Sequence, residues 1–170
     1  MMMRSFGKTL ESLMNKYTTQ QMYLEMAYVA ARQSLDPHRQ VGALLVKGNQ
    51  ILAYGFNGTP TNYPSNDCKD ENGKTYSHVV HAEINAITKA AEHGVSTKNS
   101  TLYSTTVPCI ECAKAIIQAG ITSVIYCEDY NKCEEGKALL EIMLNEFKQV
   151  DAFSEFKRKV FGLADDVRFM

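Results

Sequence analysis

The chain has 170 residues, of which 45% are hydrophobic and 22% charged, and its formal net charge is −1. This length and composition are typical of one globular domain that buries about 70% of the surface of its unfolded chain. The near-zero charge excludes a global electrostatic attraction to duplex nucleic acid, although a small anionic ligand needs only a local cluster of donors. No apolar run approaches the roughly 20 residues of a membrane span, so no membrane partner is expected.

The first third of the chain predicts one helix and one hairpin. Residues 1–20 are polar and irregular, and the apolar periodicity of residues 21–32 predicts a helix that Asp36-Pro37 ends. Two strands follow, at residues 41–46 and 51–56, and residues 47–50 form a tight turn between them. Residues 57–80 contain several breakers and form a long loop, and a loop of this length inside a compact domain is more often functional than idle.

The rest of the chain alternates helices and strands. Helices are expected at residues 81–92, 109–119 and 137–147, and strands at residues 101–104 and 121–126, with short strands at 160–161 and 167–169. His93-Gly94 and Gly120 end the first two of these helices. This order predicts a single α/β domain over residues 1–170, with three α/β/α layers in which helices flank a mixed central sheet on both faces.

Two short motifs carry the chemistry, His81-Ala82-Glu83 and the segment from Pro108 to Cys112. His81, Cys109 and Cys112 can occupy three corners of a zinc tetrahedron and leave the fourth for water, which is the catalytic arrangement. Glu83 lies two residues from the histidine, close enough to handle the protons of that water. Both motifs fall at expected helix starts, where the partial positive charge favours thiolates.

Two other readings of the motifs remain open. The Cys-x-x-Cys spacing also occurs in thioredoxin-type redox proteins, but these do not need a nearby His-x-Glu. A closed structural zinc site would take Cys68, Cys127 or His78 as its fourth ligand.

His-x-Glu followed by Pro-Cys-x-x-Cys is the pattern of zinc deaminases that act on nucleobases. From about residue 21 to about residue 145, the chain resembles the deoxycytidylate (dCMP) deaminases of the zinc-dependent cytidine deaminase-like superfamily. The resemblance rests on four segments, residues 40–43, 55–58, 81–87 and 108–121, and residues 150–170 lie outside it. It implies a cytidine deaminase-like fold, one Zn²⁺ per chain, and hydrolysis of dCMP to dUMP and ammonia, which supplies the precursor of dTMP.

The resemblance also implies roles for individual residues. Glu83 would move protons between the attacking water, ring N3 and the leaving amine, Asn57 would hydrogen-bond the sugar, and Ala82 would offer its backbone to the pyrimidine. Arg39 is the first candidate for the 5′-phosphate, with Lys69 and Lys74 behind it. Taken alone, Asn57 is typical of a turn, and each cation is typical of a solvated surface.

Regulation and assembly are expected from the same resemblance. Gly55, Phe56, Asn57 and Gly58 match the segment linked to binding of dCTP as activator, with Mg²⁺, and dTTP as inhibitor. Many relatives have Tyr at the position of Phe56. Phenylalanine keeps the ring contact but lacks the hydroxyl, so the hydrogen bond that this hydroxyl makes is lost here. Relatives assemble as homo-oligomers, typically homohexamers.

Some relatives bind a second, structural zinc through cysteines and histidines. Asp36 stands where they carry a cysteine, which leaves only Cys68 and His78 as ligands. One zinc per chain is therefore expected.

Four alternatives stay open at this point. They are a free cytidine deaminase, a tRNA adenosine deaminase, a riboflavin-pathway deaminase and a catalytically inactive zinc-binding module. The near-neutral charge argues against the RNA enzyme, the length against a riboflavin enzyme with its fused reductase domain, and the intact Glu83 against the inactive module. The odd number of cysteines, five, and the absence of a signal-like segment at Met1 favour a cytoplasmic location.

Overall fold

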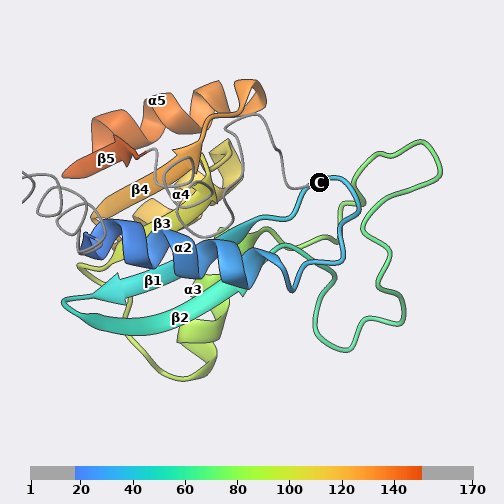
Figure 1. Cartoon of the computed structure of the whole chain (residues 1–170), viewed down its shortest axis with the longest axis horizontal. Helices are drawn as coiled ribbons and strands as arrows, with labels where there is room; N and C mark the ends of the chain where they lie inside the picture. Colours follow the sequence, from blue (N-terminus) through green and yellow to red (C-terminus); the bar gives the residue numbers. More distant parts are fainter. Residues whose placement is uncertain (1–17, 151–170) are drawn as a thin grey trace, which may run out of the picture.

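A mixed five-stranded sheet forms the middle of the molecule in a computed structural model that describes residues 18–150 (Figure 1). The strands are β1 (Gly42–Lys47), β2 (Gln50–Phe56), β3 (Thr101–Thr106), β4 (Ser123–Glu128) and β5 (Glu146–Gln149). Their order across the sheet is β2-β1-β3-β4-β5. β1 runs antiparallel to β2 and to β3, whereas β3, β4 and β5 are parallel to one another. The hairpin predicted for the first strands is therefore confirmed.

Helices cover both faces of this sheet (Figure 1). One face carries α2 (Thr19–Ala31), and the other carries α3 (Ala82–Glu92), α4 (Ile110–Gln118) and α5 (Glu134–Met143), which the short 3₁₀ helix η1 (Asn131–Cys133) precedes. In β1, Leu44 and Val46 pack under α2, while Ala43 and Leu45 pack under the other layer. A strand buried on both faces needs apolar residues at every position, and this explains the continuous apolar run. The three-layer α/β/α fold is confirmed.

The first described helix begins at a capping box. The backbone N–H of Gln21 donates to Thr18 Oγ1 (3.2 Å), and the backbone N–H of Thr18 donates to Gln21 Oε1 (3.0 Å). The helix thus begins two residues before the predicted start, because the cap satisfies its first donors. In the part of the chain that the structure describes, no helix has the length and apolar character needed to cross a membrane.

The prediction of a helix over residues 137–147 is wrong at its end. α5 ends at Met143, Leu144 is extended, and residues 146–149 form β5. Phe147 pairs with Val124 of β4 and its ring stacks on Tyr126 with 5.1 Å between centroids. This partner in β4 is remote in sequence, so pairing with it overrides the local helical periodicity.

Other boundaries shift by about two residues. β3 continues to Thr106, and β4 begins at Ser123 because the N–H of Ile121 still bonds to the carbonyl of Ile116 at the end of α4. The strands expected at 160–161 and 167–169 lie outside the described residues.

The long loop of residues 57–80 projects from one end of the sheet (Figure 1). Its two ends are joined by an antiparallel bridge between Gly58 and Val80, and a second bridge joins Lys69 to Thr75 inside the loop. The chain after Val80 enters α3 directly. The loop is therefore attached to the body at the start of α3, where the first motif lies.

Candidate metal centre

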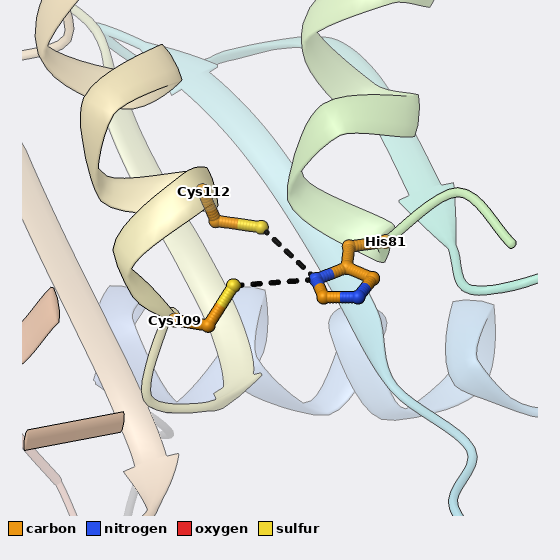
Figure 2. A group of neighbouring side chains, drawn as sticks. All are labelled: His81, Cys109 and Cys112. Atoms are coloured by element: carbon orange, nitrogen blue, oxygen red, sulfur yellow. Dashed lines mark hydrogen bonds between the residues drawn. The ribbon is translucent and has the colours of Figure 1, made fainter. Parts of the chain in front are cut away.

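His81, Cys109 and Cys112 come together between the starts of two helices (Figure 2). His81 is the N-cap of α3 and Cys109 is the N-cap of α4, and neither side chain makes a capping hydrogen bond. Cys112 lies in the first turn of α4. Because the caps are extended, each side chain leaves its helix and points toward the other motif.

The distances between the three donor atoms fit a zinc ion. Nδ1 of His81 lies 3.4 Å from Sγ of Cys109 and 3.4 Å from Sγ of Cys112, and all three atoms lie within 4.8 Å of one another. In a tetrahedral site with Zn–S of about 2.3 Å and Zn–N of about 2.0–2.1 Å, a ligand nitrogen and sulfur lie roughly 3.5 Å apart. Two thiolates and one imidazole are also donors that zinc prefers, so the residues present fit the metal.

Close packing at two glycines fixes the helix starts that carry these ligands. A Cβ at Gly55 of β2 would lie 2.2 Å from the backbone oxygen of Ala82, and a Cβ at Gly136 of α5 would lie 2.6 Å from the backbone of Cys109. Only glycine allows this approach. Gly136 was not predicted as a site residue, because the sequence places it just before the expected helix of residues 137–147, whereas α5 begins at Glu134 and includes it.

Glu83 is buried beside the ligands. It is the second residue of α3, only 4% of it is exposed, and its Oε2 lies 3.5 Å from Sγ of Cys112. Burial raises the pKa of this carboxyl because it disfavours the charged form. A carboxyl whose pKa is raised in this way holds a proton more readily than an exposed carboxyl does, which suits a group that takes a proton and returns it.

The two cysteines differ in protonation. A hydrogen bond from Cys112 lowers the pKa of Cys109 to about 3, so Cys109 is a thiolate. The pKa of Cys112 is raised, first by its hydrogen bond to Cys109 and then by burial, so Cys112 keeps its proton. The hydrogen bond with Cys109 also raises the pKa of His81. A metal ion must therefore displace at least the Cys112 proton.

Zinc binding is expected to release protons and to weaken as the pH falls. Bound metal requires the deprotonated ligands, so a lower pH favours the metal-free protein, and each proton released changes the association constant about tenfold per pH unit. Calorimetric titration with zinc in two buffers of different ionisation enthalpy counts these protons between pH 6 and 8. A Cys112→Ala variant is the control and should lose most of the affinity. An affinity independent of pH would contradict this assignment of protons.

Two of the three ligands, His81 and Cys109, line a cavity of about 200 Å³, and the third, Cys112, is buried behind them. Besides His81 and Cys109, the lining includes Ala82, Glu83, Asn57, Arg39, Lys69, Asp36, Val41, Thr75, Val79, Thr106, Val107, Tyr130 and Cys133. The structure therefore brings most of the predicted site residues to one place. Tyr130 and Cys133 were missed by the sequence analysis, because they follow β4 with no motif around them.

Asn57 joins two neighbouring segments at the cavity wall. Its Oδ1 accepts from the N–H of Val41 (2.8 Å), and its Nδ2 donates to the carbonyl of Arg39 (2.9 Å). These two partners fix the orientation of the amide. One N–H and one lone pair of the side chain are left for a ligand.

The structure separates the three cations predicted for the phosphate. The Arg39 guanidinium lies 3.9 Å from the centroid of the Tyr130 ring, and both residues line the cavity. Lys69 also lines it, with 15% of its side chain exposed. Lys74 is not among the lining residues. Its backbone N–H donates to Oδ1 of Asp70 (2.8 Å).

The residues considered for a second zinc do not gather. Among residues 18–150, the only group of three candidate ligand atoms within 4.8 Å is His81, Cys109 and Cys112. Asp36 pairs with Lys69 at 3.2 Å, and the His78 ring stacks with the rings of Tyr63 and Tyr76. Neither Cys68, Cys127 nor His78 supplies a fourth ligand to the described group.

The predicted effector segment lies at the end of β2 against α3. The carbonyl of Phe56 accepts from Nδ2 of Asn85 (2.8 Å), and the Nζ of Lys89 lies 5.1 Å from the Phe56 ring. Gly55 is buried under α3, and Gly58 forms the bridge to Val80. The segment thus connects the metal-bearing helix to the long loop.

Comparisons with known proteins agree with this geometry. A family described as "Cytidine and deoxycytidylate deaminase zinc-binding region" matches residues 17–128. Human deoxycytidylate deaminase is 38% identical over 129 residues, which are 68% of this chain and 68% of the human protein. Deoxycytidylate deaminase of Enterobacteria phage T2 is 31% identical over 153 residues, covering 66% of this chain and 81% of the phage protein.

A solved structure shares the fold as well. The dCMP deaminase of cyanophage S-TIM5, in complex with dCMP and dUMP, superposes with a TM-score of 0.75 at 34% identity, covering 79% of this chain and all of that one. The family match, these relatives and the His81, Cys109 and Cys112 group together show that the chain belongs to the cytidine and deoxycytidylate deaminase zinc-binding family.

Proposed function

We propose that this protein hydrolyses the amino group of dCMP to give dUMP and ammonia, and so supplies the precursor of dTMP. The observation that carries this proposal is the position of the Glu83 carboxyl. It is buried, and its Oε2 lies 3.5 Å from the sulfur of Cys112, one of the three ligands of the zinc site. Three protein ligands and one open position are typical of catalytic zinc. Relatives named deoxycytidylate deaminase, and the cyanophage enzyme that binds dCMP and dUMP, indicate the substrate.

The chemistry divides between a metal and one carboxylate. His81, Cys109 and Cys112 would hold a zinc ion, which would supply a Lewis acid and an activated water at neutral pH. Glu83 takes a proton from the attacking water, gives it to ring N3 of cytosine, and later helps to protonate the amine that leaves from C4. Its burial keeps bulk water from competing for that proton.

Three residues of the cavity orient the substrate. Ala82 and Asn57 line the cavity, and in this proposal the backbone of Ala82 contacts the pyrimidine while the remaining amide groups of Asn57 contact the sugar. The Arg39 guanidinium lies over the Tyr130 ring at the cavity wall, and in this proposal it binds the 5′-phosphate. These roles place the amino group of the base at the zinc and the phosphate at the cation.

Ammonia release with dCMP, deoxycytidine, CMP and dCTP side by side tests the substrate. We expect kcat/KM for dCMP to exceed that for deoxycytidine by at least about 100-fold, because a charge-assisted contact to the phosphate is lost in the nucleoside. Equal rates with deoxycytidine would indicate a free cytidine deaminase. No ammonia from any of the four with the zinc-loaded protein would indicate a tRNA deaminase or an inactive module.

We also propose that the enzyme is a cytoplasmic homohexamer that dCTP with Mg²⁺ activates and dTTP inhibits. None of the five cysteines forms a disulfide, which favours a reducing compartment. The segment from Gly55 to Gly58 borders α3 and the long loop, where a bound effector can change the position of His81. Adding dCTP or dTTP to the same assay, with sedimentation of the protein, tests regulation and assembly together.

A further inference from the structure

The Lys69 ammonium is held at the cavity wall by two protein groups. Its Nζ lies 3.2 Å from Oδ2 of Asp36 and donates to Oγ1 of Thr75 at 2.7 Å. An ammonium has three N–H donors, so one is left over. Lys69 lines the same cavity as His81 and Glu83.

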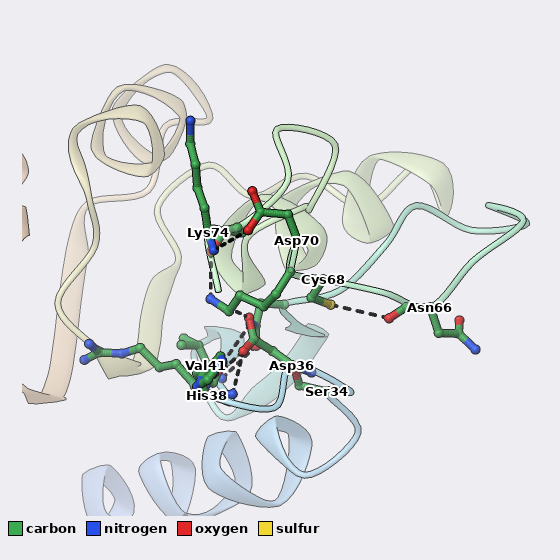
Figure 3. Close-up of polar contacts among 12 residues, drawn as sticks. Ser34, Asp36, His38, Val41, Asn66, Cys68, Asp70 and Lys74 are labelled. Carbon is green, nitrogen blue, oxygen red and sulfur yellow. Dashed lines mark hydrogen bonds and ion pairs between the residues drawn. The ribbon is translucent and has the colours of Figure 1, made fainter. Parts of the chain in front are cut away.

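The carboxylate of Asp36, which Figure 3 shows beside His38, connects this lysine to Arg39. Asp36 is buried, with 3% of its side chain exposed. Its Oδ1 accepts from the backbone N–H groups of His38 (2.8 Å) and Arg39 (3.0 Å), and its Oδ2 pairs with Lys69. One buried carboxylate therefore fixes the backbone from which Arg39 projects and the ammonium of Lys69.

The charges of this cluster leave an excess of one positive charge at the cavity wall. Lys69 and Arg39 contribute two positive charges and Asp36 one negative charge. Both carboxylate oxygens of Asp36 already have protein partners, whereas Lys69 keeps a donor and Arg39 has guanidinium donors over the Tyr130 ring. A phosphate dianion needs such donors from more than one direction.

We propose that Lys69 and Arg39 together bind the phosphate of the nucleotide substrate, with Asp36 and Thr75 holding Lys69 in place. This inference rests on the proposed function and adds a second cation, carried by the long loop, to the contacts of the phosphate. The proposal also assigns a function to the long loop, because the folded loop brings Lys69 to Asp36 and to the cavity that Arg39 lines. The alternative is that Lys69 only neutralises Asp36.

A charge-matched variant distinguishes the two roles. Lys69→Met removes the cation but leaves Asp36 buried without its partner, which is expected to destabilise the protein. Asp36→Asn with Lys69→Met removes both charges, keeps the net charge of the cluster, and leaves an amide oxygen for the N–H groups of His38 and Arg39. Lys74→Met is the control, since this loop lysine does not line the cavity.

The experiment measures KM for dCMP and deoxycytidine, and calorimetric Kd for dUMP and deoxyuridine, in these variants. We expect the single and the double Lys69 variants to raise KM for dCMP and Kd for dUMP about 10- to 100-fold, the size of a lost charge-assisted contact. Values for deoxycytidine and deoxyuridine should change less than about twofold, and Lys74→Met should change neither pair.

Two results with the double variant would overturn the role of Lys69. One is an equal loss of affinity for the nucleotide and the nucleoside, and the other is no loss of affinity for either. Absence of dCMP deamination by the zinc-loaded wild-type protein would instead overturn the proposed function, and the inference with it. The two failures are distinguishable because the second is seen without any substitution.

Discussion

Replacing Glu83 with glutamine is expected to lower kcat for dCMP by about 10²- to 10⁴-fold, the usual contribution of a general acid–base group. Glutamine keeps the shape of the side chain and can still contact the Cys112 sulfur, but it cannot take a proton from water. Zinc should remain bound, because the three ligands His81, Cys109 and Cys112 are untouched. Ammonia release and metal analysis of the same preparation measure the two effects.

Glu111→Gln is the matched control for this substitution. Glu111 also lies in the first turn of a helix that carries a ligand, but its side chain is 72% exposed and forms an ion pair with Lys114. Its removal should change kcat less than about twofold, because an exposed ion pair contributes little. Full deaminase activity in zinc-loaded Glu83→Gln would falsify the proposed role of the carboxyl.

The zinc ligands were predictable from sequence because their geometry is local. Cys109 and Cys112 are separated by one helical turn, and His81 and Glu83 by two residues at a helix start, so spacing alone nearly fixes how each group points. The pairing of the two motifs needed only that both helices begin at the same end of the sheet. The α/β alternation along the chain supplied that condition.

The parts that sequence could not predict depend on contacts between distant segments. β5 exists because Phe147 pairs with Val124 and packs on Tyr126, although its own sequence continues a helical pattern. The pair of Asp36 and Lys69 joins residues 33 positions apart. Arg39 and Lys74 both had the sequence features of a surface cation, and only the folded loop shows that one lines the cavity and the other does not.

Gly55→Ala is expected to lower the free energy of unfolding by about 1–3 kcal/mol, the range typical of an overpacked interior. The added Cβ would lie 2.2 Å from the carbonyl oxygen of Ala82 and 2.5 Å from the N–H nitrogen of Ala86, and neither backbone atom can rotate away. Either β2 or the first turn of α3 must move. Because His81 directly precedes that turn, the movement should separate Nδ1 from the two sulfurs and weaken zinc binding.

Gly58→Ala, three residues later in the same segment, separates this effect from a general intolerance of alanine. Its Cβ would find nothing closer than the Phe56 ring at 3.9 Å, and its φ lies outside the positive range, so neither a clash nor backbone strain is expected. The free energy of unfolding should change by no more than about 1 kcal/mol in either direction. Urea unfolding of the metal-free proteins and chelator competition for zinc measure both quantities. If the two alanine variants were equally stable and bound zinc equally well, the close contact between β2 and α3 would not be what positions His81.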